Sequence, residues 1–120
     1  MKDIPLGTSL SKSMATTAEM GTAHAGPAVL STPAMIGLME VVSLQSVTPF
    51  MEEGEQTVGT MVHVWHRAAS KIGDPVDIEA RLIERDRRKL LFEVKAVCKG
   101  KLVGEGTHER FVIDTRKFAA

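Results

Sequence analysis

The side chains of this 120-residue sequence that could do acid–base chemistry begin with Glu40, which lies in an otherwise apolar run. A carboxylate withdrawn from water is costly unless it is hydrogen-bonded or protonated. Burial also raises the pKa of a carboxyl group, which makes it a better general base near neutral pH. A helix edge that faces solvent explains Glu40 equally well, so both interpretations stay open.

Histidine and threonine supply two further candidates. His66 ends an alternating series with Val62 and Val64, so a strand would direct it to the same face, where it could orient a substrate or relay protons. A core-edge histidine bonded to a backbone carbonyl is the simpler explanation. Ser31 or Thr32 can cap a helix, and Thr32 could instead present its hydroxyl at the helix's positive end. His63 lies three residues from His66 and would face the other side of a strand, so we expect no metal site there.

One helix and a series of strands must position these groups. Residues 32–47 carry a helical pattern, in which Pro33 suits the first turn and Pro49 ends the element. Residues 34–39 are apolar on all sides, which predicts a buried helix. Gly37 costs about 1 kcal/mol relative to alanine in a helix, so we expect it to permit close approach by another backbone or a ligand.

Residues 56–114 alternate with period two in four segments separated by turn sequences, and residues 8–17 could add an edge strand. Each strand has one apolar face, and the helix is the only element that can cover it. The sequence therefore predicts one α+β domain over residues 1–120, in which an antiparallel sheet wraps around one central buried helix. This is the hotdog fold. Residues 1–30 would supply an N-terminal strand and a lid-like loop.

Several strand residues are candidate ligand contacts. Gly59 and Gly104 mark either close approach to a ligand or a bulge, and strict alternation places Gly59 on the face opposite His66. Arg110 could contact an acidic partner or a ligand carbonyl, with a solvated edge as the alternative. The basic cluster at residues 85–89 could bind phosphate groups, although a charged hairpin tip is usually only solvated.

Composition restricts the partners. Fifteen basic and fifteen acidic residues cancel, so no global field attracts nucleic acid or an anionic membrane. Four Phe, one Trp and no Tyr leave little for base stacking. The single Cys98 excludes an internal disulfide and is expected to be an inert core thiol. With no signal peptide and no apolar run of ~18 residues, we expect a cytoplasmic protein that binds neither nucleic acid nor membranes.

Together these residues resemble a known family. The strings Ser31-Thr32-Pro33, Gly37-Leu38-Met39-Glu40, Val58-Gly59-Thr60 and Gly104-Glu105-Gly106-Thr107-His108-Glu109-Arg110 are similar to those of the fluoroacetyl-CoA thioesterases, which are hotdog proteins. The resemblance covers about residues 30–113. That family has Phe-rich residues before the catalytic threonine, whereas residues 21–30 here contain no aromatic. The family's reaction therefore carries over better than its selectivity for fluorine.

The resemblance implies an acyl-CoA thioesterase that releases a short-chain acid and coenzyme A, with no separate cofactor. It implies catalytic roles for Thr32, Glu40 and His66. It also implies substrate contacts at Gly59 and Arg110 and coenzyme A contacts at Val103 and Gly104. As a hypothesis, Glu40 acts as general base or nucleophile, His66 polarises it, Thr32 orients the attacking group, and a backbone N–H near Gly59 stabilises the oxyanion.

Spacing and resemblance together predict an oligomer. On one continuous helix Thr32 and Glu40 would lie ~12 Å apart, so either Thr32 folds back or a second subunit completes the site. Proteins similar to this one build their sites between protomers, which favours a homodimer, with tetramers as an alternative. A hotdog hydratase or dehydratase, a non-catalytic acyl-CoA-binding module and a structural dimer remain alternative functions. The sequence specifies neither the acyl group nor whether coenzyme A or acyl carrier protein carries it.

Overall fold

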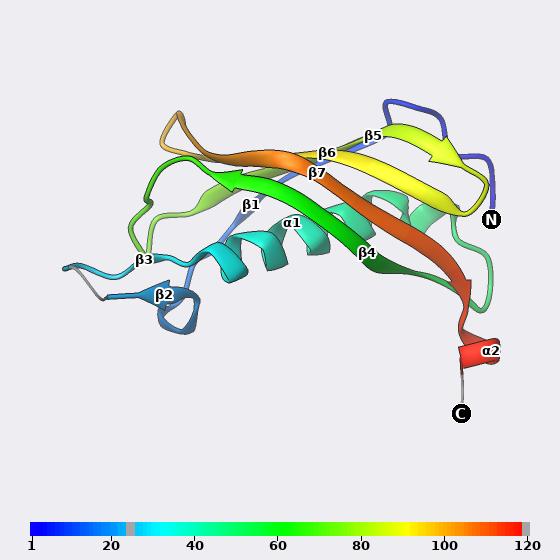
Figure 1. The fold of residues 1–120 in the computed structure, drawn as a ribbon, viewed down its shortest axis with the longest axis horizontal. Coiled ribbons are helices and arrows are strands. Elements are labelled where there is room, and N and C mark those ends of the chain that lie inside the picture. Colours follow the sequence, from blue (N-terminus) through cyan, green and yellow to red (C-terminus); the bar gives the residue numbers. More distant parts are fainter. Residues whose placement is uncertain (24–25, 119–120) are drawn as a thin grey trace.

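A computed structural model of the chain describes residues 1–23 and 26–118. Five strands form one antiparallel sheet in the order β1-β5-β6-β7-β4, and the sheet curves around the helix α1 (Figure 1). The elements of this layer are β1 (Ser9–Met14), α1 (Thr32–Val47), β4 (Glu55–His66), β5 (Val76–Asp86), β6 (Lys89–Cys98) and β7 (Lys101–Asp114). None of the helices among the described residues combines the length and the apolar character needed to cross a membrane. The predicted α+β hotdog fold is confirmed.

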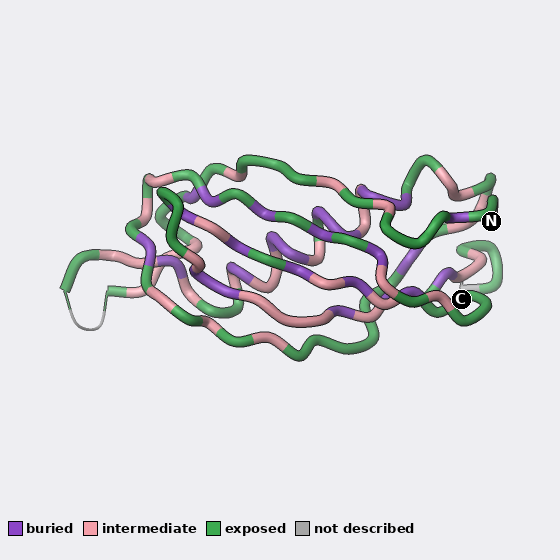
Figure 2. Tube along the Cα trace, turned by 90° about the horizontal axis from the view of Figure 1, so that it is seen from above, coloured by how far each residue is buried: buried purple, intermediate pink, exposed green. Residues whose placement is uncertain are grey.

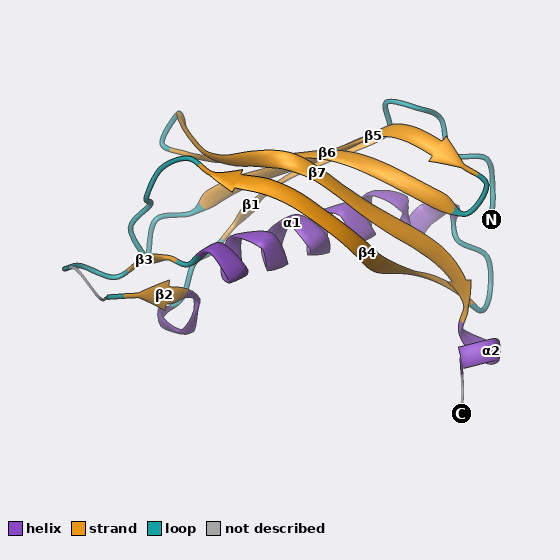
Figure 3. Cartoon of the chain, in the orientation of Figure 1, coloured by secondary structure: helices purple, strands orange, loops and turns teal. Residues whose placement is uncertain are grey.

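Short elements complete the chain (Figure 3). They are the 3-10 helices Ala18–Met20 and Thr48–Phe50, the strands β2 (Gly21–Thr22) and β3 (Val29–Leu30), and the helix α2 (Thr115–Phe118). The predicted edge strand is confirmed as β1. Part of the expected lid-like loop is instead ordered by pairing of β2 with β3. His24 and Ala25, within that loop prediction, lie outside the described residues.

Helix α1 begins where the sequence indicated. Ser31 is the cap, because its hydroxyl accepts a hydrogen bond from the Ala34 N–H at 3.2 Å, and Pro33 lies in the first turn. One face of the helix packs on the sheet, with buried residues Met35, Leu38, Met39, Val42, Ser43, Ser46 and Val47. The other face is not covered, and Val41 is 42% exposed. The prediction of a helix buried all round is therefore wrong for a single chain, because the sheet covers only one side of it.

The apolar faces of the strands meet this helix. In β6 the residues Leu90, Phe92, Val94, Ala96 and Cys98 are all buried, and this alternation appears as purple segments between pink and green in Figure 2. Cys98 is a free, buried thiol, as predicted. Gly37 faces open space, since a Cβ built there meets no atom within 4 Å. The predicted close approach at Gly37 is therefore not made within one chain.

Strand β4 contains a bulge that decides which residues share a face. Gly59 pairs with Arg110, but Met61 pairs with Glu109, so Thr60 has no partner of its own on β7. An inserted residue reverses the alternation beyond it. Consequently Gly59 and His66 both face the helix side of the sheet, and the prediction that they lie on opposite faces is wrong.

Candidate functional site

Thr32 and His66 meet at the end of the molecule where α1 begins and β4 ends. The Thr32 Oγ1 and His66 Nδ1 atoms lie 2.7 Å apart, although the residues are 34 positions apart in sequence. Because Ser31 caps the helix, the hydroxyl of Thr32 is free to make this contact. Both residues line a pocket of about 390 Å³, together with Val29, Leu30, Arg67, Ala68 and Ala69. The structure therefore brings together two of the three predicted catalytic residues.

His66 is held as a neutral imidazole. Burial lowers its pKa, because the cationic form loses solvation. Its Nε2 atom is buried and has no hydrogen-bond partner within residues 1–23 and 26–118. Buried N–H groups without an acceptor are rare, so the tautomer that carries its proton on Nδ1 is favoured. In that tautomer Nδ1–H donates to Thr32 Oγ1 and leaves the Thr32 O–H available to a ligand.

Glu40 lies about two turns along α1, over Gly59. A Cβ built on Gly59 would come within 2.7 Å of Glu40 Oε2, so only glycine leaves room for the carboxylate in this position. The nearest cation is Arg110, whose Nη1 is 3.7 Å from Glu40 Oε2. The Glu40 side chain is 41% exposed. In one chain the carboxylate is thus neither withdrawn from water nor freely solvated.

Arg110 is the most tightly held cation in this region. Its Nε donates to Thr57 Oγ1 at 2.8 Å, its Nη2 to the Thr57 carbonyl at 2.9 Å, and its Nη1 to His108 Nε2 at 3.1 Å. The solvated-edge interpretation of Arg110 is wrong, since its side chain is only 6% exposed. An acidic neighbour, Glu40, is confirmed.

His108 fixes this arginine and was not singled out as a site residue. Its Nδ1–H donates to the Met61 carbonyl at 2.9 Å, which leaves Nε2 to accept from Arg110. Burial lowers the pKa of His108, and the neighbouring Arg110 charge lowers it further, so the ring is neutral as this pattern requires. The sequence signal was the period-two spacing of His108 and Arg110, which places both on the face that Phe92 and Leu90 occupy in β6.

Val103 and Gly104, the expected coenzyme A contacts, are buried. The Val103 carbonyl accepts from the N–H groups of Arg67 at 2.6 Å and Ala68 at 3.2 Å. Gly104 lets the sulfur of Met35 pack directly on its backbone, in space that a Cβ would fill. Both residues therefore lie directly beside the segment that lines the Thr32–His66 pocket.

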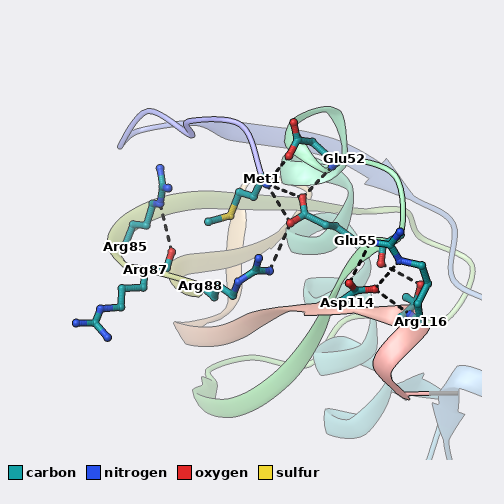
Figure 4. Close-up of polar contacts among 10 residues, drawn as sticks. Met1, Glu52, Glu55, Arg85, Arg87, Arg88, Asp114 and Arg116 are labelled. Carbon is teal, nitrogen blue, oxygen red and sulfur yellow. Dashed lines mark hydrogen bonds and ion pairs between the residues drawn. The ribbon is translucent and has the colours of Figure 1, made fainter. Parts of the chain in front are cut away.

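The remaining sequence candidates are placed as follows. The basic cluster at residues 85–89 lies on the β5–β6 hairpin, at the opposite end of the sheet from His66. There Arg85 pairs with Asp3 at 2.8 Å and Arg88 with Glu55 at 3.4 Å. Figure 4 shows the second of these ion pairs, so two of the four cations of the cluster have a carboxylate partner among the described residues. His63 faces away from His66 and packs against Trp65 in a tilted arrangement with ring centroids 4.7 Å apart.

The candidate site consists of two halves in a single chain. One half is the Thr32–His66 pair, and the other is Glu40 with Gly59 and Arg110. The halves are separated by eight residues of continuous helix, which at 1.5 Å per residue is roughly 12 Å. Thr32 is the first residue of α1 and does not fold back, so the first of the two alternatives that the spacing left open is wrong.

Comparisons with known proteins give a consistent answer. A family model described as fluoroacetyl-CoA-specific thioesterase matches residues 11–116. A fluoroacetyl-CoA thioesterase of Streptantibioticus cattleyicolor is 39% identical over 94 residues, covering 78% of this chain and 68% of that protein.

Solved structures agree. A fluoroacetyl-CoA thioesterase structure superposes with a TM-score of 0.90 at 30% identity, covering 98% of this chain and 93% of that one. A variant of such an enzyme in complex with fluoroacetate and CoA gives 0.89 at 31% identity, covering 96% and 99% of the two chains. A Thermus thermophilus member of the thioesterase superfamily gives 0.89 at 29% identity, covering 98% and 90%. The chain therefore belongs to the family of fluoroacetyl-CoA-specific thioesterases and is an acyl-CoA thioesterase of the hotdog fold.

Proposed function

We propose that this acyl-CoA thioesterase hydrolyses short-chain acyl-CoA esters with Thr32, His66 and Glu40 as its catalytic residues. The observation that carries the proposal is the 2.7 Å contact between Thr32 Oγ1 and His66 Nδ1 at a pocket. A hydroxyl oriented by a neutral imidazole, next to an open pocket, is suited to acyl transfer. A non-catalytic binding module would have no use for a threonine hydroxyl fixed in this way.

The reaction needs one base, one oxyanion donor and water. Glu40 takes a proton from a water molecule as the water oxygen attacks the thioester carbonyl carbon. The Thr32 O–H, held by His66, donates to the carbonyl oxygen as negative charge develops there. The C–S bond then breaks, and the proton held by Glu40 passes to the leaving thiolate, which yields the free acid and coenzyme A. Every group in this scheme is water or a side chain, so it requires no cofactor.

The two halves of the site can meet only if a second copy contributes one of them. Strand β4 is at the edge of the sheet, and an open edge of twelve residues is a template for strand pairing. It exposes several apolar side chains at 37–48%, namely Val58, Met61, Val62 and Trp65. We therefore propose a homodimer in which the β4 strands of two copies pair in antiparallel fashion and join the two sheets.

The bulge in β4 suggests a specific register for this pairing. If the twofold axis passes through His63, Val64 lies opposite Val62 of the second copy and Trp65 opposite its Met61. Because Thr60 is the extra residue, His66 then lies opposite Gly59 of the second copy, and paired residues share a face. This register would bring Thr32 and His66 of one copy towards Glu40 of the other, and would create two equivalent sites.

Thiol release from a panel of acyl-CoA esters tests the activity. We expect turnover of acetyl-, propionyl- and fluoroacetyl-CoA and strong losses in Glu40→Gln and His66→Ala. No thiol release from any short ester would end the proposal, and addition of water to an enoyl-CoA without thiol release would indicate a hydratase. Residues 21–23 and 26–30 carry no aromatic side chain to enclose the acyl group, so we expect fluoroacetyl- and acetyl-CoA to differ by less than about tenfold in kcat/KM.

Mixing two inactive variants tests the shared site. Glu40→Gln and His66→Ala each disable both sites of their own dimer. In a mixed dimer one site would carry both substitutions and the other would carry none. Random exchange of subunits should therefore restore about a quarter of the wild-type activity. Complete absence of recovery, with mixed dimers demonstrated by mass, would mean that each site lies within one chain. Native mass also distinguishes a dimer from a tetramer.

A further inference from the structure

A second pocket lies beside the Thr32–His66 pocket at the same end of the molecule. It has a volume of about 490 Å³ and shares Val29 and Ala69 with the first pocket. The loop between β4 and β5 and the tight β6–β7 turn form its walls, and Ser70 and Cys98 line it as buried residues. A molecule held at Thr32 can therefore continue into this second pocket without crossing the body of the protein.

Three lysines line the second pocket, and only one of them has a carboxylate partner. Lys99 Nζ lies 3.3 Å from Asp74 Oδ2. Lys71 and Lys101 make no ion pair with any of the described residues. The whole chain carries no net charge, so an excess of cations at one place is a local feature. Unneutralised ammonium groups around a pocket attract a ligand with several negative charges.

Ser70 provides an independent sign of a missing ligand. Its residue is 5% exposed, and its Oγ has no hydrogen-bond partner among the described residues. A buried hydroxyl without a partner costs stability, so native proteins keep such groups rarely and for a reason. Its backbone is fixed, because the Ser70 carbonyl accepts from the Leu30 N–H at 2.9 Å and Lys71 bridges to Val29. The residue that carries this hydroxyl thus lines the same pocket as the lysines.

We propose that this pocket binds the phosphate groups of coenzyme A through Lys71, Lys101 and the Ser70 hydroxyl. The proposal rests on the proposed function, which places the thioester of the same molecule at Thr32 and His66. Phosphate oxygens accept charge-assisted hydrogen bonds from ammonium groups and from hydroxyls. Lys99 contributes less, because Asp74 already offsets its charge. The pocket would bind the end of the substrate that does not react, so it should affect KM rather than kcat.

Substrates with and without phosphate separate binding from chemistry. We compare the double variant Lys71→Ala, Lys101→Ala with wild type on acetyl-CoA and on acetyl-pantetheine, which lacks every phosphate. The expected result is a rise of about tenfold in KM for acetyl-CoA with unchanged kcat, and unchanged kcat/KM for acetyl-pantetheine. Lys89→Ala, at the opposite end of the sheet, is the matched control and should alter neither. An unchanged KM for acetyl-CoA overturns the proposal, and so does an equal loss on both substrates.

The phosphate has two possible sources, and one further substrate distinguishes them. Acetyl-phosphopantetheine carries only the phosphate that coenzyme A shares with acyl carrier proteins. A loss in the double variant on this substrate assigns the lysines to the shared phosphate. A loss confined to acetyl-CoA assigns them to the nucleotide phosphates, and either result supports a phosphate pocket.

Binding of coenzyme A itself tests the pocket without turnover. Calorimetry with coenzyme A should show about tenfold weaker binding to the double variant and weaker binding to Ser70→Ala, whose thermal stability without ligand should not fall. If wild type hydrolyses no thioester, the proposed function fails while this measurement still decides the pocket. Equal affinity of wild type and double variant for coenzyme A, with both folded by circular dichroism, overturns the pocket proposal.

Discussion

Two histidines, His66 and His108, lie on the same face of one sheet and differ in how many of their ring nitrogens are hydrogen-bonded. In the first, His66 contacts Thr32 and leaves a buried ring nitrogen without a partner among the described residues. In the second, both ring nitrogens of His108 are bonded, one to the Met61 carbonyl and one to Arg110. Burial lowers the pKa of both rings, although His108 is the more buried of the two, so both imidazoles are expected to be neutral at neutral pH. What distinguishes them is whether the hydrogen-bonding capacity is used up.

A polar group whose donors and acceptors are all hydrogen-bonded stabilises the fold. A group with an unused donor or acceptor can still bond to a ligand. The His108 group holds Arg110 in place beneath Glu40, and therefore acts on the site only indirectly. The His66 group lies at a pocket and has a hydroxyl free to donate. Substitution in the two groups should consequently separate catalysis from stability.

The largest effect is expected from His66→Ala. Loss of the imidazole frees the Thr32 hydroxyl to rotate, and removal of such a positioned group lowers kcat by about 10²- to 10⁴-fold. The thermal midpoint should change little, because one ring nitrogen is unsatisfied already. Steady-state thiol release and calorimetric unfolding on the same preparation measure both quantities. A variant that unfolds early but turns over normally would reverse the assignment of the two groups.

His108→Leu should reduce the stability of the fold more than it reduces kcat. It leaves the Met61 carbonyl and one Arg110 N–H without partners inside the protein, which costs about 2–4 kcal/mol of unfolding free energy. Denaturant titration measures this loss. His108→Gln can still accept from Arg110 and should recover part of it, while His63→Ala on the outer face should stay within about 0.5 kcal/mol of wild type. An unaltered midpoint in His108→Leu would show that the cluster is not structural.

Gly59→Ala tests the position of the Glu40 carboxylate, which lies over Gly59. The new methyl group would lie 2.7 Å from Glu40 Oε2 and 3.2 Å from His108 Cε1, and the carboxylate at the end of its flexible side chain is the group that can move. We expect kcat to fall about tenfold, since displacement of a base by about 1 Å is costly. Gly37→Ala meets no atom within 4 Å and should instead raise the unfolding temperature slightly. Full activity in Gly59→Ala would place the base elsewhere.

The smallest effect is the pH dependence of stability. Both histidines have pKa values below the ordinary value of 6.5 because burial disfavours the cation. The unfolded chain then binds more protons than the folded one just below that pH, so stability is present above pH 6.5 and falls as the pH drops towards the folded pKa values. Thermal midpoints between pH 8 and pH 5 measure this slope. His108→Gln should flatten it, and a midpoint that rises on acidification would contradict the lowered pKa values.

The sequence predicted the fold because its signals were local. Pro33 and Pro49 bound the helix, and alternation marked every long strand. The division of roles between Ser31 and Thr32 was left open, because both hydroxyls suit a cap and only the contact with His66 decides between them. The exposure of Glu40 could not be read from its apolar neighbours, since the face of the helix that carries it is left open by a single sheet.

Long-range pairing was harder to anticipate. In the sequence His108 is marked only by its place in the family-like string that ends at Arg110, and nothing local shows that it accepts a hydrogen bond from Arg110. Lys71 and Lys101 are 30 positions apart and meet because the loop before β5 lies against the β6–β7 turn. Hydrogen bonds and charges of this kind depend on topology, which a local pattern does not contain.

The extra residue at Thr60 has a consequence for any comparison of relatives. Gly59 and His66 are seven positions apart, an odd separation, and they share a face only because Thr60 has no partner of its own on β7. A relative that lacks this one residue would still direct the corresponding histidine towards the helix, because regular alternation over six positions returns to the same face. A relative that keeps the residue but forms a regular strand would instead turn its counterpart of His66 to the outer surface and bring that of His63 inward. A one-residue gap at the bulge therefore leaves the face of the His66 imidazole unchanged, whereas loss of the bulge alone reverses it.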